Sequence, residues 1–313
     1  MATSNDYSFN MTRDEIIREA FEIIGVYNPA DTMSSEDLQK GVRTLNLMIR
    51  SWEANKIYLW TNQEAIVFPV IGQAKYVLGP TGDKAGEIGS FIRTAVSTDA
   101  LAAATSLFVD DTTGMTVADR IGIKTVENEL HWTTIATIPT STSLTINNAL
   151  PDDSDSGSVV YSYTTQIQKP LFVTSVRRRD NQNLDQALTG YARDEYMSLP
   201  AKSDQGTPSV FYYHPLTTTG ILYIYQTPSN LNEVFHIDYI RPVQDFVNSG
   251  DDAEFPTQWL ETIIWNLAIR LAASYGKSAK AESISPYADK LFDELASSSF
   301  DSVNAIIQPK TDY

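Results

Sequence analysis

The sequence predicts an α+β protein in which helices from the two ends of the chain form one antiparallel bundle and the middle forms β-structure. Three observations predict this class. Apolar residues recur at helical spacing only near the N-terminus and near the C-terminus. The residues between them alternate at period two and are interrupted by turn residues. Strands and helices do not alternate along the chain, which argues against a parallel α/β sheet.

The N-terminal part of the chain contains two predicted helices. Thr12 and Glu15 have the spacing of a capping box, and Gly25 provides a stop for the helix that they begin. Ser34 or Ser35 caps the second helix. The apolar residues are Ile16, Ile17, Ala20, Phe21, Ile23 and Ile24 in the first helix and Leu38, Val42, Leu45, Ile49 and Trp52 in the second. Each set lies on one side of its helix, so each helix has one stripe to bury.

Two further helices are predicted near the C-terminus. Pro256 suits the first turn of the third helix, and Gly276 follows its end. The stripe of this helix is Trp259, Leu260, Ile263, Ile264, Leu267, Leu271 and Tyr275. A fourth helix begins near Ser285, with an earlier start at Ala279 as the alternative. Its apolar residues are Tyr287, Leu291, Phe292 and Leu295.

The middle of the chain is predicted to form β-structure in two parts. Ala65 to Leu78 has the pattern of a hairpin. Residues 97–165 contain five short candidate strands separated by turns, which predicts a small inserted β-barrel or sandwich. A second set of strands is rich in β-branched and aromatic residues and lies between residues 170 and 243.

The four apolar stripes predict how the two ends of the chain meet. Burying one Leu or Trp contributes roughly 1.5–3 kcal/mol, whereas ordering the backbone costs about 1–2 kcal/mol per residue. A lone pair of helices buries its stripes poorly, but two pairs facing each other bury all four. We therefore expect residues 255–276 to pack mainly on residues 12–53. The predicted bundle core is Ile17, Phe21, Leu45, Trp52, Trp259, Ile263, Leu267 and Leu271.

The predicted organisation is a helical bundle (1–64 plus 253–300), a β-domain (65–96 plus 166–252), the inserted module (97–165) and a C-terminal tail (301–313).

Composition limits the classes of partner. The 313 residues carry a formal charge of −16, whereas DNA-binding modules are usually basic because phosphate neutralisation supplies their affinity. The simplest explanation of this charge is solubility. The chain has no cysteine, which excludes disulfides and thiolate zinc sites. No apolar run approaches the roughly 20 residues that span a bilayer, so no membrane partner is expected.

The sequence gives no sign of an enzyme. It lacks a G-x-S-x-G elbow, a phosphate loop and a G-x-G-x-x-G fingerprint. His131, His214 and His236 are far apart and have no second ligand at metal-binding spacing. Acidic residues at 110–111 and at 152–155 fall on turns, where Asp side chains usually bond to their own backbone. We therefore expect no catalytic, cofactor or metal site. A weaker alternative is calcium bound by these turns.

Two sets of side chains are candidates for binding. Arg177, Arg178 and Arg179 form the sharpest basic feature of an acidic chain and are candidates for a phosphate contact, a subunit contact or a structural ion pair. At most two of them share a face if the segment is a strand. The tyrosines at 212, 213, 223 and 225 stand on strand-like segments, where they favour a core or a subunit interface.

The C-terminal tail is a third candidate. Its apolar residues are Phe300, Val303, Ile306 and Ile307, and it continues through Pro309 to Tyr313. A segment of this length does not fold alone, so it either frays or docks on a partner.

Three stretches of the chain resemble a known family. They are "IIREAFEIIGVYNPADTMSSEDLQKGVRTLNLMIRSWEANKIYLWT", "EYMSLPAKSDQGTPSVFYYHP" and "EFPTQWLETIIWNLAIRLAASYG", and together they cover about a third of the sequence. In order and spacing they resemble the head-to-tail connector, or adaptor, family of short-tailed bacteriophages, whose members are also called packaged-DNA stabilisation or tail accessory factors. The match is to fold patterns and includes no catalytic signature.

The resemblance implies a structural protein of the virion, made in the host cytoplasm and placed at the head–tail junction. About twelve copies would form a ring under the portal protein, seal the packaged genome and offer a platform to a tail nozzle, knob or fibre protein. Genome DNA would pass through the ring without sequence-specific binding, and the tail of each copy would dock on the portal. The module at 97–165 departs from shorter members of the family.

Two other functions remain open at this stage. One is a sugar- or receptor-binding tail protein that uses the tyrosine-rich β-region. The other is a cell-wall hydrolase in which Asp152 or Asp153 is catalytic. The expected meeting of the two chain ends favours the connector, because a receptor-binding protein has no need of a helical platform built from both termini.

Overall fold

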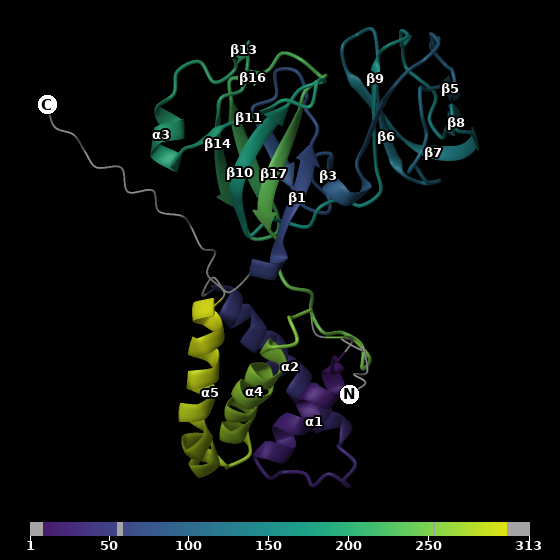
Figure 1. The fold of residues 1–313 in the computed structure, drawn as a ribbon. Coiled ribbons are helices and arrows are strands. Elements are labelled where there is room, and N and C mark those ends of the chain that lie inside the picture. The colour runs from purple at the N-terminus through teal and green to yellow at the C-terminus, as the bar shows by residue number, and fades with distance from the viewer. Residues whose placement is uncertain (1–8, 55–58, 253, 299–313) are drawn as a thin grey trace, which may run out of the picture. The chain divides into compact units, whose positions relative to one another are not determined.

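The computed structural model describes residues 9–54, 59–252 and 254–298. The chain divides into two compact units, which are Met1–Thr61 with Val243–Tyr313, and Asn62–Pro242. The described part of the chain contains five α-helices and several β-sheets (Figure 1). The predicted α+β class is therefore confirmed.

Four of the helices belong to the first unit. They are α1 (Arg13–Ile23), α2 (Ser35–Ala54), α4 (Trp259–Ser274) and α5 (Ser278–Ser298). The capping box predicted at the start of α1 is present, since the Glu15 carboxylate accepts from the Thr12 backbone N–H at 2.8 Å. Ser34 caps α2, and its hydroxyl accepts from the Asp37 N–H at 3.1 Å. Gly25 and Gly276 follow α1 and α4 with φ values of +68° and +67°, the left-handed conformation that ends helices.

Two helix boundaries differ from the prediction. Pro256 lies in a turn before α4 and not in its first turn, because the Trp259 N–H donates to the Pro256 carbonyl at 2.8 Å. The last helix starts at Ser278, next to the alternative start at Ala279 and not near Ser285, and it contains Pro286. Its turns before the proline remain helical because Ile284 packs in the core of the unit.

The helices from the two ends of the chain share one hydrophobic core. Buried residues of α1, α2, α4 and α5 belong to a single cluster. Gly41 allows α1 and α2 to approach closely, since a Cβ at this position would meet Cγ2 of Ile17 at 2.4 Å. The eight residues expected in the core all lie in this cluster and are at most 4% exposed: Ile17, Phe21, Leu45, Trp52, Trp259, Ile263, Leu267 and Leu271.

A return segment, Val243–Asp252, belongs to the helical unit, although the sequence analysis assigned it to the β-domain. Its backbone is fastened by side chains of α1 and α2. Asn46 both donates to the Phe246 carbonyl at 3.2 Å and accepts from the Phe246 N–H at 3.1 Å. Glu53 accepts from the Val243 N–H at 2.6 Å, and Arg13 donates to the Val247 carbonyl at 2.7 Å. These polar contacts have no sequence periodicity, which is why the boundary was misplaced.

The second unit contains the sheets. A five-stranded sheet has the order β11-β10-β17-β1-β3, and a four-stranded sheet has the order β12-β14-β15-β2. Buried residues of both sheets form one core. A short helix, α3 (Arg193–Ser198), precedes β14. The strands are β1 (Asn62–Val67), β2 (Lys75–Leu78), β3 (Ala85–Glu87), β10 (Phe172–Arg179), β11 (Asp185–Ala187), β12 (Thr189–Gly190), β13 (Gln205–Gly206), β14 (Val210–Pro215), β15 (Gly220–Tyr225), β16 (Thr227–Pro228) and β17 (Val234–Ile240).

The predicted hairpin at Ala65 to Leu78 is wrong. β1 pairs with β17 and β3, whereas β2 pairs with β15 in the other sheet. The two segments are strands, but each finds its partner far away in the sequence.

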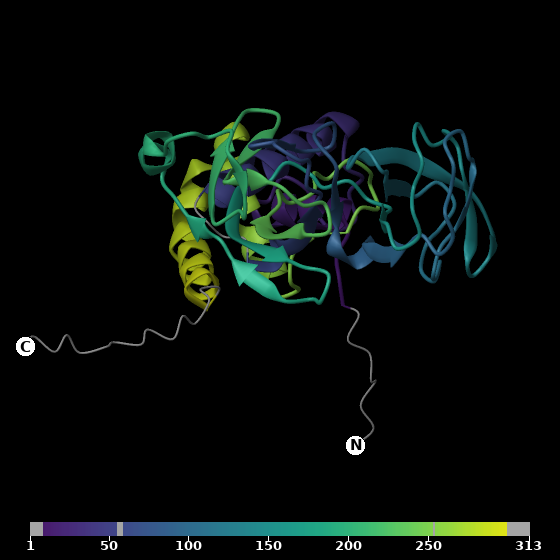
Figure 2. The ribbon, with the colours of Figure 1, turned by 90° about the horizontal axis from the view of Figure 1, so that it is seen from above.

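The module predicted at 97–165 forms a six-stranded half-barrel with the order β4-β9-β6-β7-β8-β5. The strands are β4 (Ile92–Ala95), β5 (Ser106–Phe108), β6 (Arg120–Lys124), β7 (Leu130–Thr140), β8 (Ser143–Ile146) and β9 (Val159–Tyr163). The module therefore starts earlier than expected and has one more strand, β4. Figures 1 and 2 both show it beside the five-stranded and four-stranded sheets, where Phe68 packs on Tyr161 and Tyr163.

Candidate functional site

The three arginines predicted as a contact site lie on β10 and pair with carboxylates of the same chain. Arg177 lies 2.6 Å from Glu64 and 3.4 Å from Asp238. Arg179 lies 2.6 Å from Asp185, and this bond lowers the pKa of Asp185. Arg177 and Arg179 share one face of the sheet, as expected for a strand. The structure thus places both in a structural ion-pair network.

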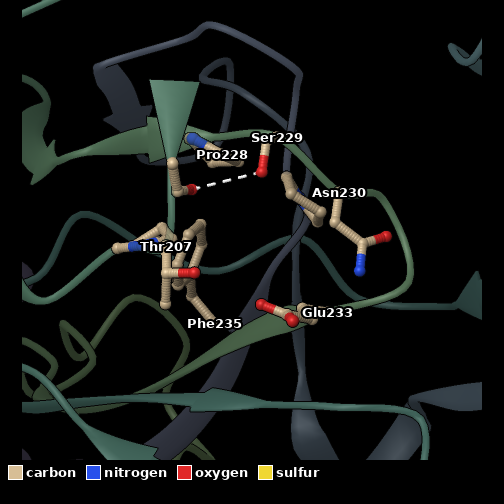
Figure 3. Close-up of a pocket in the computed structure, with 9 residues that line it drawn as sticks. Thr207, Pro228, Ser229, Asn230, Glu233 and Phe235 are labelled. Atoms are coloured by element: carbon tan, nitrogen blue, oxygen red, sulfur yellow. Dashed lines mark hydrogen bonds between the residues drawn. The ribbon is translucent and has the colours of Figure 1, made fainter. Parts of the chain in front are cut away.

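Arg178 points to the opposite face and pairs with Glu233 at 2.6 Å. Glu233 lines a small pocket with Thr207, Pro228, Ser229, Asn230 and Phe235 (Figure 3). The Ser229 hydroxyl donates across it to the Gly206 carbonyl at 3.4 Å. The cavity volume is about 20 Å³, which is room for about one water molecule. This pocket is therefore too small for a substrate or cofactor.

His236 is buried at the centre of the ion-pair network. Its ring is fully inaccessible, and Nδ1 lies 2.6 Å from Oε1 of Glu64. Nε2 has no hydrogen-bond partner among the residues that the structure describes. Burial lowers the pKa of His236 below its ordinary value of 6.5, although the bond to Glu64 opposes this shift. The guanidinium of Arg179 also disfavours a second positive charge here.

The His236 environment predicts a loss of stability in mild acid. A lowered pKa means that the unfolded chain binds a proton more readily than the folded chain does, so the free energy of unfolding rises with pH between these two pKa values. The contribution of His236 to the free energy of unfolding is fully present above pH 6.5. It decreases as the pH falls below 6.5, by at most about 1.4 kcal/mol per pH unit for one proton. Urea unfolding of the wild type and of His236→Gln at several pH values measures this. A variant whose stability falls as steeply as that of the wild type would contradict the assignment to His236.

The tyrosine cluster is partly used within the chain. Tyr212 and Tyr223 stack with ring centroids 5.5 Å apart, and Tyr196 of α3 packs on Tyr223 at 5.3 Å. Tyr213 donates its hydroxyl to the Pro170 carbonyl at 2.5 Å and packs against the core between the sheets. The rings thus pack on one another, which leaves less of their area for a sugar.

Asp side chains of the acidic turns accept hydrogen bonds from backbone N–H groups, one nearby and one distant in the sequence. Asp111 accepts from the Thr113 N–H at 2.9 Å, which lowers its pKa, and Asp153 accepts from the Ala102 N–H at 2.7 Å. Within residues 9–54, 59–252 and 254–298, no three His, Asp or Glu side chains lie close enough to hold a metal ion. His131 lies 3.3 Å from the Asn148 carbonyl, and His214 lies 3.2 Å from the Tyr212 hydroxyl.

The expected portal-docking residues lie outside the part of the chain that the structure describes. They are Phe300, Val303, Ile306, Ile307 and Tyr313. Among the helices that are described, none is long and apolar enough to cross a membrane.

The helical unit carries an apolar groove that the sequence analysis missed. This α4 groove runs beside α1 and α4 and has a volume of about 610 Å³. Its apolar lining includes Phe9, Ile23, Ile264 and Trp265, and Phe9 is 70% exposed. The acidic residues Glu19 and Glu261 also line it. A signal existed in the sequence, since Glu19 and Ile23, like Glu261 and Trp265, are four residues apart and share a helix face.

A second exposed surface that includes apolar side chains lies on α2 and the return segment. We define this α2 face by Gln39, Arg43 and Leu47, one stripe of α2 at four-residue spacing, and by Val247 of the return segment, which lines a depression with Gln39 and Arg43. Leu47 is 63% exposed and Val247 is 73% exposed. Arg43 and Val247 line the same shallow depression. The helical unit therefore has two exposed apolar surfaces, one with a cation and one with carboxylates.

Comparison with known proteins adds no family to this description. No protein-family model matches the chain, and none of the curated proteins matches it.

Proposed function

We propose that this protein is an oligomeric adaptor of a bacteriophage virion, which joins the capsid portal to the tail. The observation that carries the proposal is the single core shared by helices from the two chain ends, with the intervening sequence Asn62–Pro242 forming a separate unit. This is the arrangement that the resemblance to connector proteins implies. In this proposal the four long helices act as an antiparallel bundle and form the platform of a ring.

Contacts of α4 and α5 support the bundle. Tyr287 donates its hydroxyl to Glu261 at 2.7 Å, and its ring lies 5.0 Å from that of Trp265. Five residues further along α5, Phe292 lies 6.2 Å from Trp259. Since sequence numbers fall along α4 as they rise along α5, the two helices run antiparallel. Short connections between antiparallel helices are typical of bundles.

The net charge suits a DNA channel better than a DNA-binding surface. A chain with formal charge −16 repels phosphate at long range, and a ring of such chains does so more strongly. Genome DNA then slides through without the counterion-release affinity that basic surfaces create. The described part of the chain offers no metal cluster, and its small pocket near Glu233 holds about one water. Neither feature adds support for an enzyme.

The proposal predicts a complex with the portal protein encoded in the same phage genome. Electron microscopy of the two proteins mixed at micromolar concentration should show portal rings that carry one adaptor ring of about twelve copies. Truncation after Ser298 should leave the folded monomer intact, as judged by circular dichroism, but weaken attachment to the portal. The absence of any complex with the full chain would overturn the proposal. Equal portal binding by the truncated chain would remove only the docking role of the tail.

A further inference from the structure

We infer that the α2 face of one copy docks in the α4 groove of the next copy, head to tail. The inference rests on the proposed ring and names the surfaces that build it. Leu47 and Val247 are the apolar side chains that enter the groove, and Arg43 then faces Glu19 and Glu261. The partner of both surfaces is a second copy of this chain.

The first argument is exposure. Leu47, Val247 and Phe9 are each more than 60% exposed, whereas most large apolar residues of α1, α2 and α4 lie in the core of the helical unit. Scattered exposed apolar residues need no explanation, but Val247 and Phe9 each line a defined depression. Leu47 is one turn of α2 from Arg43, which lines the same depression as Val247. A groove of about 610 Å³ lined by Ile23, Ile264 and Trp265 has room for two aliphatic side chains.

The second argument is charge complementarity. Arg43 has no carboxylate within ion-pair distance among the residues that the structure describes, and Glu19 has no cation there. Glu261 is held in place by the Tyr287 hydroxyl at 2.7 Å, and its charge remains free to meet a cation. Opposite charges at the rim of an interface fix orientation and exclude wrong partners, while buried apolar groups supply most of the affinity.

The third argument is geometry. On α1, the residue that lines the α2 depression is Arg13, whereas Glu19 and Ile23 line the α4 groove. At about 100° per residue these positions lie roughly 80–120° apart around the helix. The two surfaces are therefore distinct patches on different sides of the unit. Distinct complementary patches make a heterologous contact, which forms a ring when the rotation between neighbouring copies closes, whereas a two-fold contact uses the same patch twice.

Charge reversal tests the inference on the full chain mixed with portal rings. Arg43→Glu places three carboxylates at one contact, so we expect the fraction of portals carrying a complete adaptor ring to fall at least about tenfold. The double variant Glu19→Arg, Glu261→Arg should have the same defect. Lys280→Glu changes the charge equally but lines neither surface, and it should assemble like the wild type.

Mixing the two defective proteins gives the decisive result. In a head-to-tail ring, Arg43→Glu copies that alternate with Glu19→Arg, Glu261→Arg copies have opposite charges at every contact. An equimolar mixture should therefore form complete rings again, as should the triple variant alone. Rings that form with either defective protein alone, or that fail to return on mixing, would overturn the inference.

Failure of the proposed function gives a different result. If the wild type does not bind portals at all, self-association is measured without portal by native mass spectrometry at increasing protein concentration. Oligomers of the wild type that weaken with Arg43→Glu and return on mixing would support the contact alone. Oligomers unaffected by these changes, or no oligomers, would overturn it.

Discussion

Replacing Phe21 with alanine is expected to lower the free energy of unfolding of the helical unit by about 3–5 kcal/mol. The Phe21 side chain is fully buried in the core shared by the two chain ends. Its ring meets Tyr27 and Tyr275 edge to face, with centroids 5.8 Å and 5.2 Å away. Tyr27 lies before α2 and Tyr275 follows α4. Alanine at position 21 therefore leaves a cavity and loses contacts with both the N-terminal and the C-terminal part of the chain.

Urea unfolding followed by far-ultraviolet circular dichroism measures this loss, because the long helices all belong to this unit. Leu47→Ala is the matched control, since it also shortens a large apolar side chain of a helix but at a position that is 63% exposed. We expect it to change stability by no more than about 0.5 kcal/mol in the monomer. A loss below about 1 kcal/mol for Phe21→Ala would contradict a tightly packed core between the ends.

The helices were predictable because their signals are local. Thr12 and Glu15 are three residues apart, and the bond between them forms within the first turn of α1. The four-residue spacing of apolar residues in α2 and α4 gives the buried side of each helix without knowledge of its partner. Pro286 misled the prediction of α5, because a local rule places proline at helix starts whereas the packing of Ile284 and Ala288 keeps both sides helical.

Strand pairing was not predictable in the same way. The alternation of apolar and polar residues identifies β1 as a strand. Its long antiparallel partner is β17, where Asn62 pairs with Ile240. Nothing in a period-two pattern specifies a partner almost 180 residues away. The nearest following strand, β2, was therefore assigned to β1 as a hairpin partner although it belongs to the other sheet.

The candidate sites were not predictable from single stretches of sequence either, because their residues come from distant parts of the chain. The partners of Arg177 lie on β1, β11 and β17, so the ion-pair network around His236 exists only once those strands are assembled. The α4 groove likewise needs Glu19 from α1 and Glu261 from α4 to lie together. Single stretches of sequence gave the residue types, but only the tertiary fold decides which charges are neutralised within the chain and which remain for a partner.

The return segment gives the second large effect, because its attachment depends on few bonds. We expect Glu53→Ala to lower the free energy of unfolding of the helical unit by about 2–3 kcal/mol. Glu53 is 8% exposed, and Oε1 accepts from the buried Val243 N–H at 2.6 Å. Its carboxylate also accepts from Arg50 at 2.9 Å. Alanine leaves a buried N–H without an acceptor, and such a group costs about 1–3 kcal/mol.

Glu53→Gln separates the hydrogen bond from the charge. The amide oxygen of glutamine can still accept from the Val243 N–H, so we expect a loss of about 1 kcal/mol, well below that of alanine. Both variants are compared by urea unfolding monitored by circular dichroism. In both variants the Asn46 side chain still bonds to the backbone N–H and the carbonyl of Phe246, which keeps the rest of the return segment in place. Equal losses in the two variants would show that the segment depends on the charge of Glu53 and its pairing with Arg50 instead of on the N–H of Val243.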